Sequence, residues 1–239
     1  MKRGGVIAAL IAGAALAFGG VMLALGFWAP WADKYVRGID VSQHQDAIDW
    51  RAVAASGVRF AYIKASEGGD YRDPMFATNW NNAARAGLKR GAYHFFTLCR
   101  SGRAQAANFI AVVPRDPDAL PPVVDLEHMG PCRRGPTTSD VKAEIASYAD
   151  EIHAHYGVRP IFYTTAQFND AHLKGAFAQE RFWARSIYQW PGFRRTQWII
   201  WQRDNRAKIQ GVSVPVDLND FRGDDRAFDA FARLSEKSS

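Results

Sequence analysis

The chain has 239 residues and a mass of 26.6 kDa, with 48% apolar and 23% charged residues, which suits one barrel-sized domain and excludes a disordered protein. Its formal charge of +6 and pI of about 9.4 would fit nucleic acid, but the Lys and Arg residues are spread along the chain without a zinc-finger or RNA-binding motif. We therefore expect no nucleic-acid partner, whereas another anionic polymer fits the charge.

The N-terminus carries a segment long enough to cross a membrane. Lys2 and Arg3 precede a mostly apolar, uncharged stretch over residues 4–30. As a helix this stretch would reach about 40 Å, more than the roughly 30 Å of a bilayer core. A cleaved signal peptide is the alternative, but no A-x-A pattern stands near the end of the stretch. We expect residues 1–32 to anchor the chain in the lipid bilayer of the cytoplasmic membrane, with the domain 33–239 outside, or to direct secretion if they are cleaved.

Beyond this segment, short β-rich runs alternate with amphipathic stretches, which is typical of an α/β fold with a largely parallel sheet. Eight runs are predicted strands: Val36–Ser42, Phe60–Ser66, Lys89–Phe96, Pro122–Glu127, Pro160–Thr165, Phe182–Ile187, Gln197–Gln202 and Val216–Phe221. Three stretches are predicted helices: Met75–Ala86, Arg103–Val113 and Ser139–Tyr156, the last capped by Thr138 or Ser139 and ended by Gly157. The later connections are too short or too aromatic for helices. The prediction is an irregular TIM-like (β/α) barrel with eight strands and fewer helices in its C-terminal third.

Carboxylates stand at the carboxyl ends of these strands, where barrel enzymes place their catalytic groups: Asp40, Asp125, Glu127 and Asp217. Asp125 and Glu127 are two residues apart on one strand, so they point to the same side. Two carboxylates in a low-dielectric pocket cannot both ionise easily, so the pKa of one rises and that group can protonate a leaving oxygen near neutral pH. Such a pair meets the requirement for glycosidic cleavage.

A metal site is the main chemical alternative, with Asp125, Glu127, His94 and His128 as ligands. However, His128 follows Glu127 directly and should face away, and the chain has no H-x-x-x-H or H-E-x-x-H spacing. His94 is more typical of a hydrogen-bonded core histidine. A Ser-His-Asp site is also disfavoured, because no G-x-S-x-G elbow is present. We expect no metal and, without a nucleotide or flavin motif, no other cofactor.

Aromatic residues cluster at the same strand ends: Tyr62, Tyr93, Phe95, Tyr163, Trp183, Trp198 and Trp201. Each one alone is more typical of a core. Gathered at a barrel mouth, several of them would form a platform on which sugar rings stack.

The chain has two cysteines, Cys99 and Cys132. Both follow predicted strands, on loops that one end of a barrel would bring together. In an exported chain we expect a disulfide, which would stabilise the fold by about 3–4 kcal/mol through the loop that it closes. Two buried thiols are the alternative.

Several segments together resemble glycoside hydrolase family 25, the Chalaropsis-type lysozymes or N-acetylmuramidases. They occur in the family's order between about residues 36 and 221: RGIDVSQHQDAIDW, FAYIKASEGGDYRDPMF, GLKRGAYHFF, PPVVDLE, RPIFYTT, FWARS, WIIWQ and VDLNDF. The first segment departs from the family, because Gln43-His44-Gln45 stands where members often carry His-Trp-Gln.

The resemblance implies hydrolysis of the β-1,4 bond between N-acetylmuramic acid and N-acetylglucosamine in peptidoglycan. By matching motifs, Glu127 would be the general acid/base, Asp125 its acidic neighbour, and Asp40 and Asp217 the rest of an acidic floor. The residues that would line the sugar groove are Tyr62, Tyr93, Tyr163, Trp183 and Trp201. Contacts near the first strand stay open because of the departure there.

The stereochemistry also stays open. A retaining, an inverting and a substrate-assisted route are all compatible with the pair, and we favour the third, in which Asp125 orients the substrate's 2-acetamido group.

Two other functions remain: a catalytically silent, membrane-anchored peptidoglycan-binding module, and a hydrolase of another polysaccharide such as chitin. The sequence does not distinguish self-remodelling, an envelope machine, attack on competitors or phage release. Without a heptad pattern, we expect a monomer.

Overall fold

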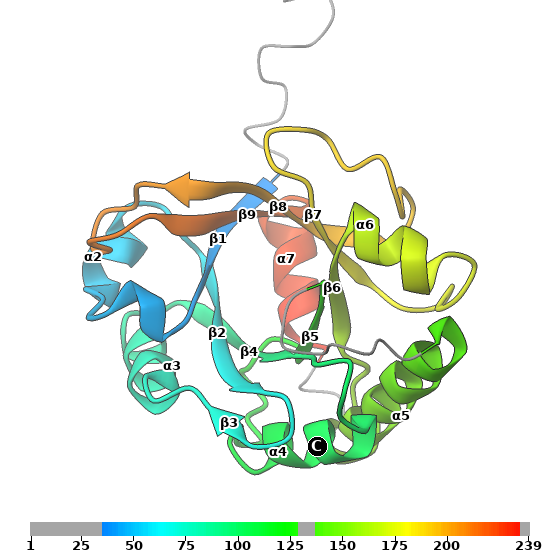
Figure 1. Ribbon diagram of the computed structural model, residues 1–239. Coiled ribbons are helices and arrows are strands. Elements are labelled where there is room, and N and C mark those ends of the chain that lie inside the picture. The colour runs from blue at the N-terminus through cyan, green and yellow to red at the C-terminus, as the bar shows by residue number, and fades with distance from the viewer. Residues whose placement is uncertain (1–34, 129–136, 235–239) are drawn as a thin grey trace, which may run out of the picture. The chain divides into compact units, whose positions relative to one another are not determined.

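Eight strands close into a barrel in the computed structural model, which describes residues 35–128 and 137–234 (Figure 1). The barrel strands are β1 (Tyr35–Val41), β2 (Phe60–Glu67), β4 (Lys89–Phe95), β5 (Val123–Leu126), β6 (Ile161–Thr165), β7 (Phe182–Arg185), β8 (Trp198–Ala207) and β9 (Val216–Arg222). β1 pairs with β2 on one side and neighbours β9 on the other, which closes the ring. A short hairpin strand, β3 (Tyr71–Arg72), adds to β2. The predicted irregular eight-stranded barrel is confirmed.

Helices cover the outside of the first half of the barrel (Figure 1). The helical elements are η2 (Gln43–Gln45), α2 (Trp50–Ala55), α3 (Phe76–Arg85), α4 (Gly102–Ile110), α5 (Thr138–Tyr156), α6 (Ala166–Phe168), η3 (Asn169–Leu173) and α7 (Asp225–Ala232). No helix separates β7 from β8 or β8 from β9, and both connections lie within the described residues. The scarcity of helices predicted for the last third is therefore confirmed.

Several details differ from the sequence prediction. α2 and α7 were not predicted, because each is too short for a clear helical period; the side chains of Asp49 and Asp224 cap them. β8 continues past the predicted Gln202, where it pairs with β9 in an antiparallel hairpin. α5 is capped one residue before the predicted positions, by Thr137, whose hydroxyl accepts from the Asp140 amide.

Helix α7 covers the end of the barrel at which the parallel strands begin. Phe228 of α7 packs against Phe60, the first residue of β2, with ring centroids 5.4 Å apart, and against Phe221 at the end of β9. Gly91 on β4 leaves room for the inward ring of Tyr62, because a Cβ there would lie 2.2 Å from that ring. The end at which the parallel strands begin is thus closed, and the end at which they finish carries the polar residues.

Two predictions involve residues outside the described ranges. The predicted anchor, residues 1–32, lies wholly outside them. No helix within residues 35–128 and 137–234 is both long and apolar enough to span a bilayer. Cys99 is not a free thiol, but Cys132 lies outside the described residues, so the disulfide between them stays a prediction.

Candidate active site

The predicted carboxylates gather at the open end of the barrel. Side chains alternate along a strand, so every second residue points inward. The strand register sets Asp125 of β5 level with Phe95 of β4 and Tyr163 of β6, and Tyr163 level with Trp183 of β7. One acid and three aromatic rings therefore share a single level of the barrel.

Two pockets lie at this end and share a wall. The first, of about 290 Å³, contains all four predicted carboxylates; its lining includes Asp40, Asp125, Glu127, Asp217, Lys64, Tyr93, Phe95, Tyr163 and Trp183. The second, of about 420 Å³, is lined by Glu127, His128, Tyr163, Thr165, Gln167, Arg185, Asn205 and Asp217. Glu127, Tyr163 and Asp217 belong to both. The pockets therefore form one groove, and Glu127 lies where they meet.

Burial shapes the charge of the acid cluster. Desolvation raises the pKa of Asp40 and Glu127, raises the pKa of Asp217 to about 8, and raises the pKa of Asp125 well above its ordinary value with help from the charge of Glu127. The cationic side chain of Arg185 acts in the opposite direction on all four pKa values. The groove therefore holds protonated carboxyl groups at a pH where ordinary carboxylates are ionised.

A hydrogen-bond network fixes the floor of the groove. Asp40 Oδ2 accepts from Asn219 Nδ2 at 2.7 Å and from Gln202 Nε2 at 3.1 Å. The other ends of these two amides accept from aromatic residues: Asn219 Oδ1 from Trp183 Nε1 at 3.1 Å, and Gln202 Oε1 from the Tyr163 hydroxyl at 3.0 Å. Asp40 thereby holds the rings of Trp183 and Tyr163 in place through two amide side chains.

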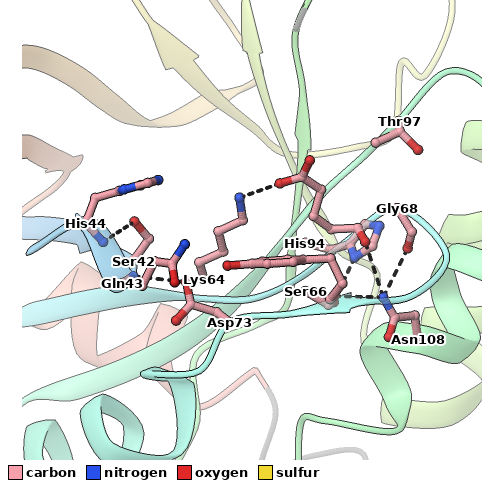
Figure 2. Close-up of polar contacts among 12 residues, drawn as sticks. Ser42, Gln43, His44, Lys64, Ser66, Gly68, Asp73, His94, Thr97 and Asn108 are labelled. Carbon is pink, nitrogen blue, oxygen red and sulfur yellow. Dashed lines mark hydrogen bonds and ion pairs between the residues drawn. The ribbon is translucent and has the colours of Figure 1, made fainter. Parts of the chain in front are cut away.

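Lys64 brings a cation to the first pocket (Figure 2). Its Nζ pairs with Glu67 Oε2 at 2.7 Å and lies 5.1 Å from the centroid of the Phe95 ring. The loop that follows is held by Asn108, whose amide nitrogen donates to the carbonyl oxygens of Gly68 and Tyr71. The Lys64 ammonium therefore lies in the same pocket as the four predicted carboxyl groups, beside a hairpin loop that Asn108 holds in place.

The five aromatic residues predicted to line the groove take different positions. Tyr93, Tyr163 and Trp183 line the first pocket. Tyr62 lies one level deeper, fully buried, with its hydroxyl bound to the Pro121 carbonyl oxygen at 3.1 Å. Trp201 lines neither pocket, and its indole nitrogen donates to the Ser186 carbonyl oxygen at 2.7 Å. The structure thus brings three of the five into the groove.

His94 is a core residue, as the sequence indicated. It is fully buried, and Nδ1 lies 2.8 Å from Ser66 Oγ (Figure 2). Nε2 lies 3.2 Å from Gln105 Oε1. Burial lowers its pKa to about 3. Since both ring nitrogens are engaged away from the acids, His94 is not placed to join Asp125 in a metal site.

Four polar residues of the site were missed at the sequence level: Lys64, Arg185, Gln202 and Asn219. A signal for them was present, because each lies two residues along its strand from an inward residue. Lys64 follows Tyr62, and Arg185 follows Trp183, in the same alternation that placed Asp125 and Glu127 together.

Comparisons with known proteins agree with this geometry. The family model described as "Glycosyl hydrolases family 25" matches residues 39–212. YegX of Escherichia coli (strain K12), described as uncharacterized, is 34% identical over 206 residues, which cover 84% of this chain and 74% of YegX. Lysozyme M1 of Streptomyces globisporus is 36% identical over 207 residues, which cover 79% of this chain and 68% of that protein. The solved structure of a family 25 glycosyl hydrolase from Bacillus anthracis superposes with a TM-score of 0.79 at 35% identity, covering 84% of this chain and 95% of that one.

The chain forms a closed barrel with paired acids at its strand ends, and hydrolases that act on glycosidic bonds match it over most of its length. These features define an enzyme of the glycoside hydrolase class. Within that class, the chain belongs to glycosyl hydrolases family 25.

Proposed function

We propose that the chain is a muramidase, which hydrolyses the β-1,4 bond between N-acetylmuramic acid and N-acetylglucosamine in peptidoglycan. The observation that carries the proposal is the position of Glu127 at the junction of two pockets, with Asp125 beneath it. A bond held across this junction has one sugar in each pocket and its oxygen beside Glu127. The similarity to Lysozyme M1 supports the choice of substrate.

Glu127 acts as the general acid and then as the base. Burial raises its pKa, which favours the protonated form that can give its proton to the glycosidic oxygen as that bond breaks. The carboxylate that remains then takes a proton from the incoming water. One side chain therefore serves both halves of the reaction.

Asp125 acts on the 2-acetamido group of the sugar in the first pocket. Its Oδ1 is buried, and none of the described residues donates a hydrogen bond to it. This oxygen accepts the acetamido N–H, which directs the acetamido oxygen at the anomeric carbon and stabilises the ring that forms as the leaving oxygen takes the Glu127 proton. Water, deprotonated by Glu127, then opens that ring.

The remaining acids and rings position the sugar. Tyr93, Tyr163 and Trp183 contact it, and Asp40 fixes the last two through the amide network. Asp217, whose pKa is raised to about 8, is protonated near neutral pH and donates a hydrogen bond within the floor.

We place the enzyme outside the cytoplasmic membrane, held by the predicted anchor over residues 1–32 or secreted after its cleavage. Without Lys2 and Arg3 of the anchor, the net charge of +6 falls to +4, which still suits an anionic wall. The proposed enzyme is a monomer that needs no cofactor.

Clearing of purified peptidoglycan suspensions by the full chain tests the proposal. Wild type should clear the suspension and release fragments with reducing-end muramic acid, and Glu127→Gln should lose at least about a hundredfold in rate because the proton donor is gone. Glu151→Gln, the same change on the surface of α5, should keep wild-type activity. Binding to the wall without clearing would instead indicate the silent module, and preferential clearing of chitin another polysaccharide hydrolase.

Proton NMR of the first-formed anomer tests the route. The substrate-assisted route gives the β anomer, because two inversions occur at the same carbon. An α anomer formed first would refute the role given to Asp125 while leaving the muramidase assignment intact.

A further inference from the structure

Figure 1 shows the loop that connects β7 to β8. This loop carries two exposed large aromatic side chains. In the described part of the chain the large apolar side chains with substantial exposure are Tyr71 at 36%, Trp190 at 44% and Tyr188 at 70%. Two of the three stand two residues apart in this one loop. Neighbouring exposed rings are typical of an interaction surface.

Tyr188 is held in place although its ring faces solvent. Its backbone amide donates to the Arg203 carbonyl oxygen at 2.8 Å, and its hydroxyl donates to Asp204 Oδ1 at 3.1 Å. The same carboxylate oxygen accepts from the Arg206 amide at 2.8 Å. The backbone of Tyr188 has a φ of 58°, a region that aromatic residues rarely adopt. A strained backbone and a bound hydroxyl fix this ring in its exposed position.

Trp190 is held by two other indoles. Its ring packs edge-on against Trp198, with centroids 4.9 Å apart, and against Trp201 at 5.6 Å. Trp201 also binds the loop directly through Ser186. The residue that the sequence placed in the groove therefore positions this loop instead.

The loop starts directly after Arg185, a residue that lines the second pocket. Arg185 and Asn205 line that pocket. Each is next in the chain to a residue that holds the loop: Ser186, bound by Trp201, and Asp204, bound by Tyr188. Tyr188 is thus anchored beside the edge of the second pocket, whose lining does not include Asp125.

We propose that Tyr188 and Trp190 form an outer sugar-binding platform, which binds a further part of the glycan strand beyond the second pocket. The inference rests on the proposed function. Sugar rings present C–H faces that stack on aromatic planes, and a polymer lying along the groove must leave it at one of its ends. The exposed Arg206, whose backbone amide binds the same Asp204 oxygen as the Tyr188 hydroxyl, suits the carboxylates carried by muramic acid and its peptides.

Affinity as a function of strand length tests the platform. Binding of peptide-free fragments of four and eight sugars is measured by calorimetry on the full chain carrying Glu127→Gln, which prevents turnover. Adding Tyr188→Ala should weaken binding of the eight-sugar fragment about fivefold, the loss expected for one stacking ring, and change the four-sugar affinity by less than about twofold. Tyr188→Phe, which keeps the ring and removes the hydroxyl, should retain eight-sugar affinity within about twofold.

The outcomes separate the platform from the catalytic proposal. Equal weakening for both lengths, or none for the longer one, overturns the platform while the groove remains a glycan site. If the Glu127→Gln chain binds neither fragment and wild type clears no peptidoglycan, the proposed function fails and the platform with it.

Discussion

Asn219 connects a buried acid to a buried indole, and its removal should be costly. The side chain is fully buried, donates to Asp40 Oδ2 at 2.7 Å and accepts from Trp183 Nε1 at 3.1 Å. Asn219→Leu keeps the branching at Cγ in a larger side chain, but leaves an indole N–H without its acceptor and a carboxylate with one donor fewer. A buried polar group without its partner costs about 1–3 kcal/mol, and more where it is charged, so the free energy of unfolding should fall by about 3–5 kcal/mol.

Urea unfolding followed by tryptophan fluorescence measures this loss, provided that the slope of the transition is unchanged. Asn205→Ala, at an exposed asparagine, should lose less than about 0.5 kcal/mol. A loss below about 1 kcal/mol for Asn219→Leu would show that the network does not stabilise the fold as its geometry implies.

Three further results are expected. Because Arg185 lowers the pKa of Glu127, Arg185→Gln should move the alkaline limb of the kcat/KM profile to higher pH, as measured on soluble glycan fragments. Gly91→Ala should lower stability by about 1–3 kcal/mol in thermal unfolding, because the new Cβ would overlap the Tyr62 ring. The pKa of His94 is about 3 in the folded chain, below its ordinary value of 6.5. At a pH between these two pKa values, the unfolded chain therefore binds one proton that the folded chain does not bind. Stability should therefore fall as pH drops below 6.5, by about 1.4 kcal/mol per unit, and His94→Gln should remove that contribution in urea unfolding at several pH values.

Matched changes check each result. Arg185→Lys keeps the charge and should leave the alkaline limb near its wild-type position. Gly192→Ala meets no atom within 4 Å and should be nearly neutral. If wild type and His94→Gln lose stability in parallel on acidification, the buried imidazole is not the group that titrates.

Most of the barrel could be predicted from the sequence, because its signals are local. Each strand is a β-rich run between turn residues, and the alternation of inward and outward side chains brought Asp125 and Glu127 to one side. α2 escaped prediction because six residues span fewer than two turns and show no period. The second half of β8 escaped because its polar residues, including Arg203 and Asp204, have the composition of a loop and become a strand only by pairing with β9.

The site was predicted less completely, because a sequence gives the side on which a residue points but not its depth in the barrel. Tyr62 and Tyr163 both point inward, yet the first lies below the groove and the second within it. Trp201 lies in a predicted strand as Trp183 does, but its indole turns to the β7–β8 loop. Only the pairing register, which depends on residues far apart in the chain, decides these levels.

The place of β1 in the sheet has a consequence for the order in which the chain can fold. Its two neighbours are β2, which follows at once, and β9, which follows all the other barrel strands. One edge of β1 therefore stays without its partner until β9 has left the ribosome, and a chain exported before that moment closes its barrel only at its destination. An enzyme of the proposed kind would then remain inactive inside the cell that makes it.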